Sequence, residues 1–348
     1  MTSEPKELRR GWTTGACATA ATKAALVRLW GGAFDEEVSI TLPRGETPDF
    51  TLAETAFCTE WAEAAIIKDA GDDPDVTHGA MIRSRVTLGG HGIRFKAGAG
   101  VGTVTKPGLP IGVGEPAINP VPRQMMQDIV AEMAAKYGAD PQVEIEISID
   151  NGLEIAKKTW NPRLGIVGGL SVLGTTGVVR PFSCSAWIAS IHRGIDVARA
   201  TGLTHVAGCT GATSEKVVQG LYDLPLEAML DMGDFAGGLL KYLRKHPVER
   251  VTIGGGIGKM VKLAQGAVDL HSGRSQVDFS RLAELCDDAS ICNMNTALQA
   301  YEKIGKPLAN NVAHEALLQI RKQLRDTPIQ VDVVIIDRVG LVIGRAQE

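Results

Sequence analysis

No apolar run in this 348-residue chain approaches the roughly 18–20 residues that a membrane-spanning helix needs. Met1 to Arg10 are polar and lack the apolar core of a secretion signal. The six cysteines are scattered and form no Cys-x-x-Cys pair, which excludes a disulfide framework and a zinc site. A net charge of only −4 gives no electrostatic footprint for nucleic acid. These absences predict a cytoplasmic protein with reduced thiols and no membrane, nucleic-acid or protein-held metal partner.

Glycine, by contrast, is abundant, at 40 of 348 residues, or about 11% against the usual ~7%. The hydrophobic fraction of 44% and the charged fraction of 22% are ordinary for a globular protein. The excess glycine therefore indicates tight turns and close ligand contacts rather than disorder. Because the chain is too long for one typical core, we expect two domains, residues 1–180 and 181–348.

The densest interleaving of glycine and proline extends from residue 98 to residue 123. Its prolines are incompatible with a helix interior or a central strand. Glycines allow close backbone approach to a ligand, while prolines restrict the chain, so the pattern is typical of a long loop held in one shape. Such loops are usually functional. Lys106, Glu115, Asn119 and Arg123 place polar groups on this loop.

Three further segments carry candidate chemistry. Thr13 and Thr14 precede an alanine-rich helix over 16–30, and either serve as a plain helix cap or help to form an anion site. Residues 68–79 combine four acids with His78, which fits either a base- or ligand-bearing loop or a cluster of Asx turns. Residues 161–181 are again rich in glycine and form a candidate cleft wall joining the two halves.

The two halves show different patterns of secondary structure. In the first, strands between residues 37 and 96, a helix over 120–137 and a strand over 143–149 with a returning hairpin predict an α+β domain with a largely antiparallel sheet. In the second, strands near 205–207, 251–253 and 330–337 alternate with helices, which predicts a Rossmann-like α/β domain with a parallel sheet and an antiparallel edge hairpin. Ligands of such sheets bind at the carboxyl ends of the strands.

The glycines after these strands do not match phosphate-binding motifs. Gly254 to Lys259 is one residue short of a P-loop, and Met260 replaces the required Ser or Thr. Neither the glycines at 98, 100 and 102 nor those at 254, 256 and 258 form a GxGxxG motif. An adenosine-type ligand without phosphates fits these turns better than a nucleotide does, because it needs close approach of the backbone but brings less negative charge for the protein to neutralise. The residues alone thus indicate a two-domain enzyme with a cleft for a polyanionic ligand, and an ATP-dependent phosphotransferase stays open as an alternative.

Several blocks along the chain resemble the CbiD family of cobalt-precorrin-5B C1-methyltransferases. The matching blocks are residues 10–15, 69–79, 100–123, 161–165, 174–177, 258–259 and 271–272. The resemblance implies S-adenosylmethionine-dependent methylation at C1 of a ring-contracted corrinoid, giving cobalt-precorrin-6A. The chain departs from the family pattern at Gly256, where histidine is common, and at Gly208 to Gly211, which replaces a Pro-Gly-Asn-type turn. A non-catalytic tetrapyrrole carrier is the alternative from a different class.

From the chemistry of the implied reaction we assign hypothetical roles to particular residues. S-adenosylmethionine is the co-substrate, cobalt enters only as part of the corrinoid, and a homo-oligomer is left open. The catalytic candidates are Asp75 or Glu115 as a base, with His78 assisting. The substrate-binding candidates are Arg10, Thr13, Thr14, Thr105, Lys106, Asn119, Arg123 and Arg163. The donor-binding candidates are Gly208, Thr210, Gly211, Gly254, Gly255, Gly258 and Asp337.

Overall fold

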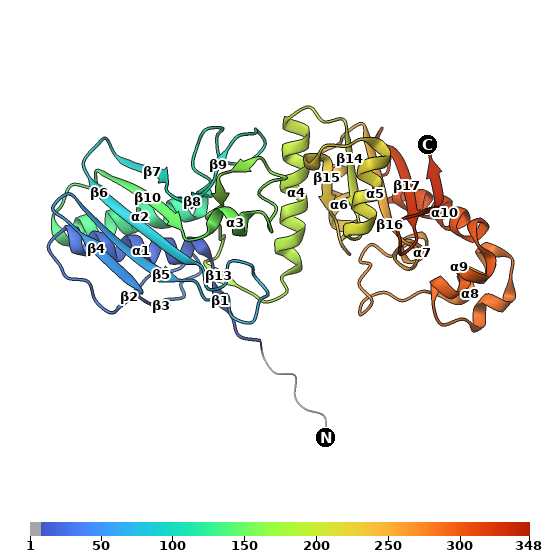
Figure 1. Ribbon diagram of the computed structural model, residues 1–348, viewed down its shortest axis with the longest axis horizontal. Coiled ribbons are helices and arrows are strands. Elements are labelled where there is room, and N and C mark those ends of the chain that lie inside the picture. The colour runs from blue at the N-terminus through green and yellow to red at the C-terminus, as the bar shows by residue number, and fades with distance from the viewer. Residues whose placement is uncertain (1–7) are drawn as a thin grey trace, which may run out of the picture. The chain divides into compact units, whose positions relative to one another are not determined.

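The computed structural model describes residues 8–348 (Figure 1). Within that range no helix has the length and apolar character needed to cross a membrane. The chain divides into two compact units, the first ending at Ser183 and the second running from Cys184 to Glu348. This division falls just beyond the expected boundary after residue 180. The expectation for Met1 to Arg10 lies mostly outside the described residues, which begin at Leu8.

A five-stranded sheet in the order β4-β5-β6-β10-β7 forms the centre of the first unit. Its neighbouring strands run antiparallel, except that β10 and β7 are parallel. Side chains of β10 alternate between buried and half-buried, as its sequence predicts. The largely antiparallel sheet is therefore confirmed. The strands of this sheet are β4 Glu54–Phe57, β5 Trp61–Ile67, β6 Met81–Leu88, β7 Ile93–Ala97 and β10 Val143–Ile149, and a separate hairpin joins β2 Glu37–Ser39 to β3 Asp49–Thr51.

Helix α1 (Thr14–Leu29) packs against β5, β6 and helix α2 (Pro120–Tyr137) (Figure 1). The alanines of α1 are buried, and their short side chains let the helix lie close to the sheet. The helix begins where Thr13 Oγ1 accepts a hydrogen bond from the backbone N–H of Ala16 at 3.2 Å. Both predicted helices are confirmed, and Thr13 is the N-cap residue.

The strand expected to return from β10 is instead a short helix, α3 (Gly152–Ala156). Both edges of β10 are already paired, with β6 and β7, so no edge remains for a hairpin partner. Asn151 adopts a left-handed φ of 56°, and a Cβ on Gly152 would lie 2.2 Å from the carbonyl oxygen of Gly100. The chain turns away from the sheet at this point, and the hairpin prediction was wrong.

The two glycine-rich passages pair with each other inside the first unit. A Cβ on Gly169 would lie 2.2 Å from the carbonyl oxygen of Gly100, so their close approach depends on glycine. Residues 161–181, expected to be a wall between the halves, are therefore a partner of the 98–123 loop. The short paired strands are β8 Gly100–Val101 with β12 Gly169–Leu170, β9 Thr103–Val104 with β11 Ile166–Val167, and β1 Gly11–Trp12 with β13 Val178–Val179.

A second five-stranded sheet, in the order β15-β14-β16-β17-β18, forms the centre of the second unit. The first four strands are parallel and β18 is an antiparallel edge strand, as predicted. The strands are β14 His205–Cys209, β15 Met229–Asp231, β16 Arg250–Gly256, β17 Gln330–Ile336 and β18 Val342–Gln347. The helices are α4 Cys184–Ala200, α5 Ala212–Tyr222, α6 Ala236–Leu243, α7 Ile257–Ala264, α8 Phe279–Cys286, α9 Ala297–Ile304 and α10 Lys306–Leu324, with 3₁₀ turns at Leu226–Ala228 and Ala289–Asn293.

The strand order of this sheet changes direction between β14 and β16. β15 pairs on one side of β14, whereas β16 and the later strands extend on the other side. At such a switch point the loops leaving the carboxyl ends of two adjacent strands separate, and ligands of open α/β sheets bind there. We therefore expect a ligand site at the segments that follow Cys209 and Gly256.

Candidate functional site

Residues 69–79 form a loop anchored by a buried ion pair. Lys68, only 1% exposed, donates from Nζ to Asp75 Oδ2 at 2.7 Å. The backbone N–H and hydroxyl of Thr77 both donate to Asp75 Oδ1, at 2.8 and 2.7 Å. Burial acts to raise the pKa of Asp75, but the Lys68 charge and these hydrogen bonds outweigh it and hold the pKa below its ordinary value. Both carboxylate oxygens are engaged, so Asp75 serves as an anchor of the loop.

His78 stands at the end of this loop with about half of its side chain exposed. The backbone N–H of Ala70 donates to its Nδ1 at 3.1 Å, so the neutral ring carries its hydrogen on Nε2. Asp69 pairs with Arg9, and hydrogen bonding to that guanidinium lowers the pKa of Asp69 to about 2. Asp69 also accepts from the backbone N–H of Gly71 at 2.9 Å, an Asx turn. Among residues 8–348, no cluster of three or more His, Cys, Asp or Glu side chains could hold a metal.

Arg123 ties the 98–123 loop together. Its guanidinium donates to the carbonyl oxygens of Ile118 and Pro116, at 2.9 and 3.0 Å. Both terminal nitrogens also donate to Glu115 Oε2 at 3.2 Å. Within the described chain the other oxygen, Glu115 Oε1, has no hydrogen-bond partner, and the side chain is 53% exposed. Of the two carboxylates predicted as bases, Glu115 is thus the one whose geometry leaves an oxygen available.

The other polar candidates of the first unit fall into two groups. Thr13 caps α1, and three further side chains bond to backbone groups of the second glycine-rich passage. These contacts are Thr14 with Leu173 at 3.0 and 3.2 Å, Thr105 with Gly165 at 2.7 Å, and Asn119 with Val172 at 3.4 Å. Their polar groups therefore hold the glycine-rich segments in register rather than standing free for a ligand.

Of the basic candidates, Arg10 is exposed, whereas Lys106 and Arg163 are half-buried. The side chain of Arg10 is 53% exposed and lies 3.5 Å from Glu46. Lys106 packs its aliphatic stem against Gly165, where a Cβ would lie 2.6 Å from Lys106 Cγ. The guanidinium of Arg163 lies 5.7 Å from the ring centroid of Trp160. These three cations border the glycine-rich segments and suit a ligand that carries carboxylates.

The second unit contains a cavity of about 740 Å³ at the carboxyl ends of its parallel strands. Of the donor-binding candidates, Thr210, Gly211, Gly258 and Asp337 line it. The remaining three are not part of its lining. Gly208 lies against Leu239 and Met232, Gly254 against Val218 and Cys209, and Gly255 against Thr210 and Met260. These three glycines serve close packing behind the cavity, whereas the first four face it.

Charged groups of both signs line this cavity. The N-cap residues of helices α5 and α7 are Gly211 and Gly256, neither of which has a side chain to cap the helix, so backbone N–H groups of the first turns are available there. Asp337 Oδ1 accepts from the backbone N–H groups of Val339 and Leu341 at 2.9 and 2.8 Å. Asp337 thus closes the turn between β17 and β18 while lining the cavity.

Two lysines of helix α7, Lys259 and Lys262, also line the cavity. Sequence reasoning noted Lys259 only in motif comparisons, not as a site residue, and did not name Lys262. Their spacing of three residues, directly after a strand and a glycine turn, places both on one face of a helix and is the signal that could have found them. The sequence also gave no indication of Asn295 and Thr296, which reach the cavity from the segment before α9.

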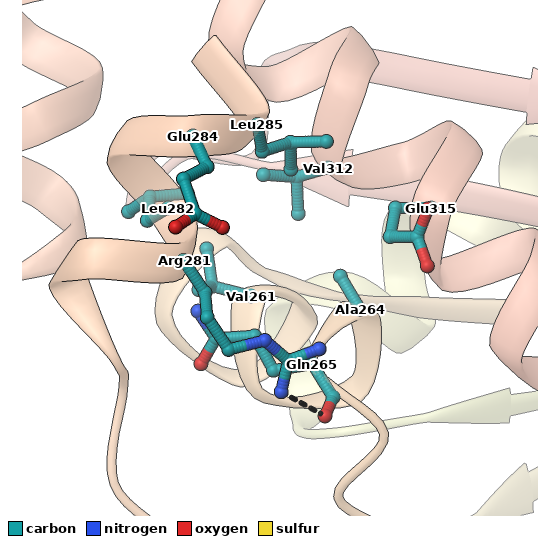
Figure 2. Close-up of a pocket in the computed structure, with 9 residues that line it drawn as sticks. All are labelled: Val261, Ala264, Gln265, Arg281, Leu282, Glu284, Leu285, Val312 and Glu315. Atoms are coloured by element: carbon teal, nitrogen blue, oxygen red, sulfur yellow. Dashed lines mark hydrogen bonds between the residues drawn. The ribbon is translucent and has the colours of Figure 1, made fainter. Parts of the chain in front are cut away.

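A smaller cavity of about 320 Å³ lies on the same unit (Figure 2). Figure 2 shows apolar side chains of helices α7, α8 and α10, among them Val261 and Val312, with the carboxylates of Glu284 and Glu315 at the margin. Arg281 donates to the backbone carbonyl of Gln265 at 3.0 Å. None of the predicted site residues lines this cavity.

An open parallel α/β sheet with a cavity outside the carboxyl ends of its strands is the architecture of α/β proteins that bind small organic ligands. Comparison with protein-family models identifies the family to which the chain belongs. The CbiD family model matches residues 1–181, and the model described as "CbiD, C-terminal domain" matches residues 269–347. The chain belongs to the CbiD family.

Curated relatives match over nearly the whole chain. A protein of Brucella anthropi is 58% identical, covering 98% of this chain and 96% of its own length. A protein of Paramagnetospirillum magneticum is 56% identical, covering 99% of both chains. Both are named cobalt-precorrin-5B C(1)-methyltransferase. A crystal structure of a cobalamin biosynthesis protein (cbiD) from Archaeoglobus fulgidus is 26% identical, with a TM-score of 0.42, covering 77% of this chain and 83% of that one.

Proposed function

We propose that this chain transfers the methyl group of S-adenosylmethionine to C1 of cobalt-precorrin-5B, giving cobalt-precorrin-6A in cobalamin biosynthesis. The observation that carries the proposal is the 58% identity, over nearly the full length of both chains, to a relative named for this activity. The cytoplasmic location expected from composition suits such a reaction. The second unit, with parallel strands joined by helices, supports the Rossmann-like reading of its fold.

The donor is assigned to the cavity of the second unit. A volume of about 740 Å³ falls within the ~300–1,000 Å³ of small-molecule sites. The donor carries a sulfonium, an ammonium, a carboxylate and the hydroxyls of a ribose. A lining with Asp337, two lysines and the hydroxyls of Thr210 and Ser214 offers partners for each of these groups.

The macrocycle is assigned to the glycine-rich segments of the first unit. The substrate is a flat apolar ring edged with carboxylates. Arg10, Lys106 and Arg163 supply cations for those carboxylates, while Val113 and Val167, each 59% exposed, supply apolar surface. The hydrogen bonds of Arg123 and of the threonines keep this surface in a fixed shape, which lowers the entropy cost of binding.

In methyl transfer the C1 carbon forms a bond to the methyl carbon while the bond from that carbon to sulfur breaks in line. The enzyme contributes mainly by alignment and exclusion of water, which is worth up to ~7–11 kcal/mol in well-oriented systems. We assign Glu115 Oε1 as the base that keeps the macrocycle in its nucleophilic tautomer, and His78 Nε2–H as a hydrogen-bond donor. Asp75 is assigned the role of anchoring the loop that carries His78.

The test is incubation of the purified protein with precorrin-5B forms, with and without cobalt, in the presence of S-adenosylmethionine. The proposal expects a product heavier by one methylene unit with the cobalt form. Binding of the corrinoid without any change in mass would favour a carrier. Turnover with the metal-free form alone would retain the methyltransferase but overturn the assignment of its substrate.

A further inference from the structure

Lys262 is a largely buried lysine in the lining of the cavity of the second unit. The residue is 8% exposed and lines the cavity. Its Nζ donates to the backbone carbonyl oxygen of Leu270 at 3.1 Å. Throughout residues 8–348, no carboxylate lies within ion-pairing distance of Lys262. A buried charge without an opposite charge is costly, which makes such a group unusual unless a ligand completes its environment.

Lys259, one helical turn earlier, adds to the positive charge. Its Nζ donates to the same carbonyl oxygen of Leu270 at 3.1 Å and pairs with Asp234. A single carbonyl oxygen therefore receives two ammonium groups, while only one carboxylate is paired with them. Burial and the neighbouring Lys259 charge hold the pKa of Lys262 below its ordinary value and outweigh the opposing influence of the Asp234 and Asp269 carboxylates.

The remaining lining shows where an anion would fit. Lys259 and Lys262 lie on helix α7, whose first turn, at Ile257 and Gly258, lines the same cavity. The amino end of a helix favours negative charge. Lys259, Lys262 in the last turn of α7 and the amino end of that helix all add positive charge to the lining, which favours an anionic group of a ligand over a neutral one.

We propose that Lys262, assisted by Lys259, binds the carboxylate of the amino-acid part of the methyl donor. The inference rests on the proposed function, because it assumes that the donor occupies this cavity. It makes Lys262 a specificity-determining residue: it selects a donor that retains its carboxylate over an analogue that lacks it. No bond is formed or broken at this site.

The experiment measures binding of S-adenosylhomocysteine and of its decarboxylated analogue by calorimetry. The wild-type protein should bind the carboxylate-bearing ligand about ten- to a hundredfold more tightly, since hydrogen bonds to charged groups are the strong ones. In Lys262→Met this preference should disappear, because affinity for S-adenosylhomocysteine falls while affinity for the analogue stays. Lys241→Met, an exposed lysine of α6 outside the cavity, is the matched control and should behave as wild type.

The outcomes separate this inference from the proposed function. Equal affinity of wild-type protein for the two ligands would overturn the inference even if Lys262→Met did not fold. A Lys262→Met protein that keeps the full preference would overturn it as well, and in both cases methylation of the corrinoid would leave the proposed function standing. Failure of the wild-type protein to bind either ligand would overturn both.

Discussion

Replacing Lys68 with methionine tests whether the ion pair beneath the 69–79 loop organises that part of the first unit. The substitution keeps the length of a side chain that is 1% exposed but leaves Asp75 without its cation. Breaking a buried pair typically costs 3–5 kcal/mol. Because the Asp75 side chain is 25% exposed and keeps its two bonds from Thr77, we expect a lower cost, about 2–3 kcal/mol.

Urea unfolding followed by tryptophan fluorescence measures this cost. Four of the five tryptophans belong to the first unit, so the signal reports mainly on it; they are Trp12, Trp30, Trp61 and Trp160. Lys68→Met should lower the transition midpoint without changing the slope with urea. Lys96→Met, which removes an exposed pair with Glu146, is the control and should change little. Equal midpoints for Lys68→Met and wild type would refute the reasoning.

The same pair sets the pH dependence of stability. The pKa of Asp75 is lower in the folded protein than in the unfolded chain, so its stabilising contribution is fully present above the unfolded value of ~3.9 and is lost as pH falls through the folded value. Without Lys68 the folded pKa rises, because burial is then less opposed. The stability difference between wild type and Lys68→Met should therefore shrink as pH falls from about 7 to about 3, measured by urea unfolding at both pH values, and an unchanged difference would contradict this account.

Three further substitutions test the packing and the proposed site. Gly169→Ala should destabilise the first unit by about 2–3 kcal/mol, because the new Cβ would meet the Gly100 carbonyl oxygen. The control Gly112→Ala, whose Cβ would have its nearest atom at 3.5 Å, should leave the melting temperature unchanged, and equal melting temperatures for the two variants would contradict the close pairing. Glu115→Gln should slow single-turnover methylation about a hundredfold with corrinoid binding retained, and an unchanged rate would exclude Glu115 as the base. Asp337→Asn keeps the acceptor of the β17–β18 turn but removes a cavity charge, so donor affinity should fall about tenfold by calorimetry, and undiminished affinity would place the cationic part of the donor elsewhere.

Regular elements with strong local signals could be predicted from the sequence. Helix α2, which begins at a proline, the alternating strand β10 and the buried, largely apolar strand β17 are present as predicted, because each carries its own periodicity or composition. The helix over Gly152–Ala156 could not be predicted, since its cause is non-local: both edges of β10 are occupied. The short strands β4 and β15 were missed for the same reason, because tertiary pairing defines them.

The sequence predicted which segments contribute to the candidate site, but not which side-chain atoms in them are available to a ligand. The acidic and glycine-rich motifs located the loops, and the strand ends located the cavity. Spacing does not reveal how a guanidinium is used, so Arg123 was expected to bind substrate although it bonds mainly to its own loop. Nor does it reveal burial, which distinguishes Lys262 from the exposed lysines of the same unit.

The most direct test of the proposed reaction is to locate the transferred methyl group. Purified protein is incubated with cobalt-precorrin-5B and S-adenosylmethionine labelled with carbon-13 in its methyl group, and the product is analysed by carbon NMR. The proposed function predicts a single new labelled methyl group attached to C1. Label at any other ring position, or none in the corrinoid, would contradict it.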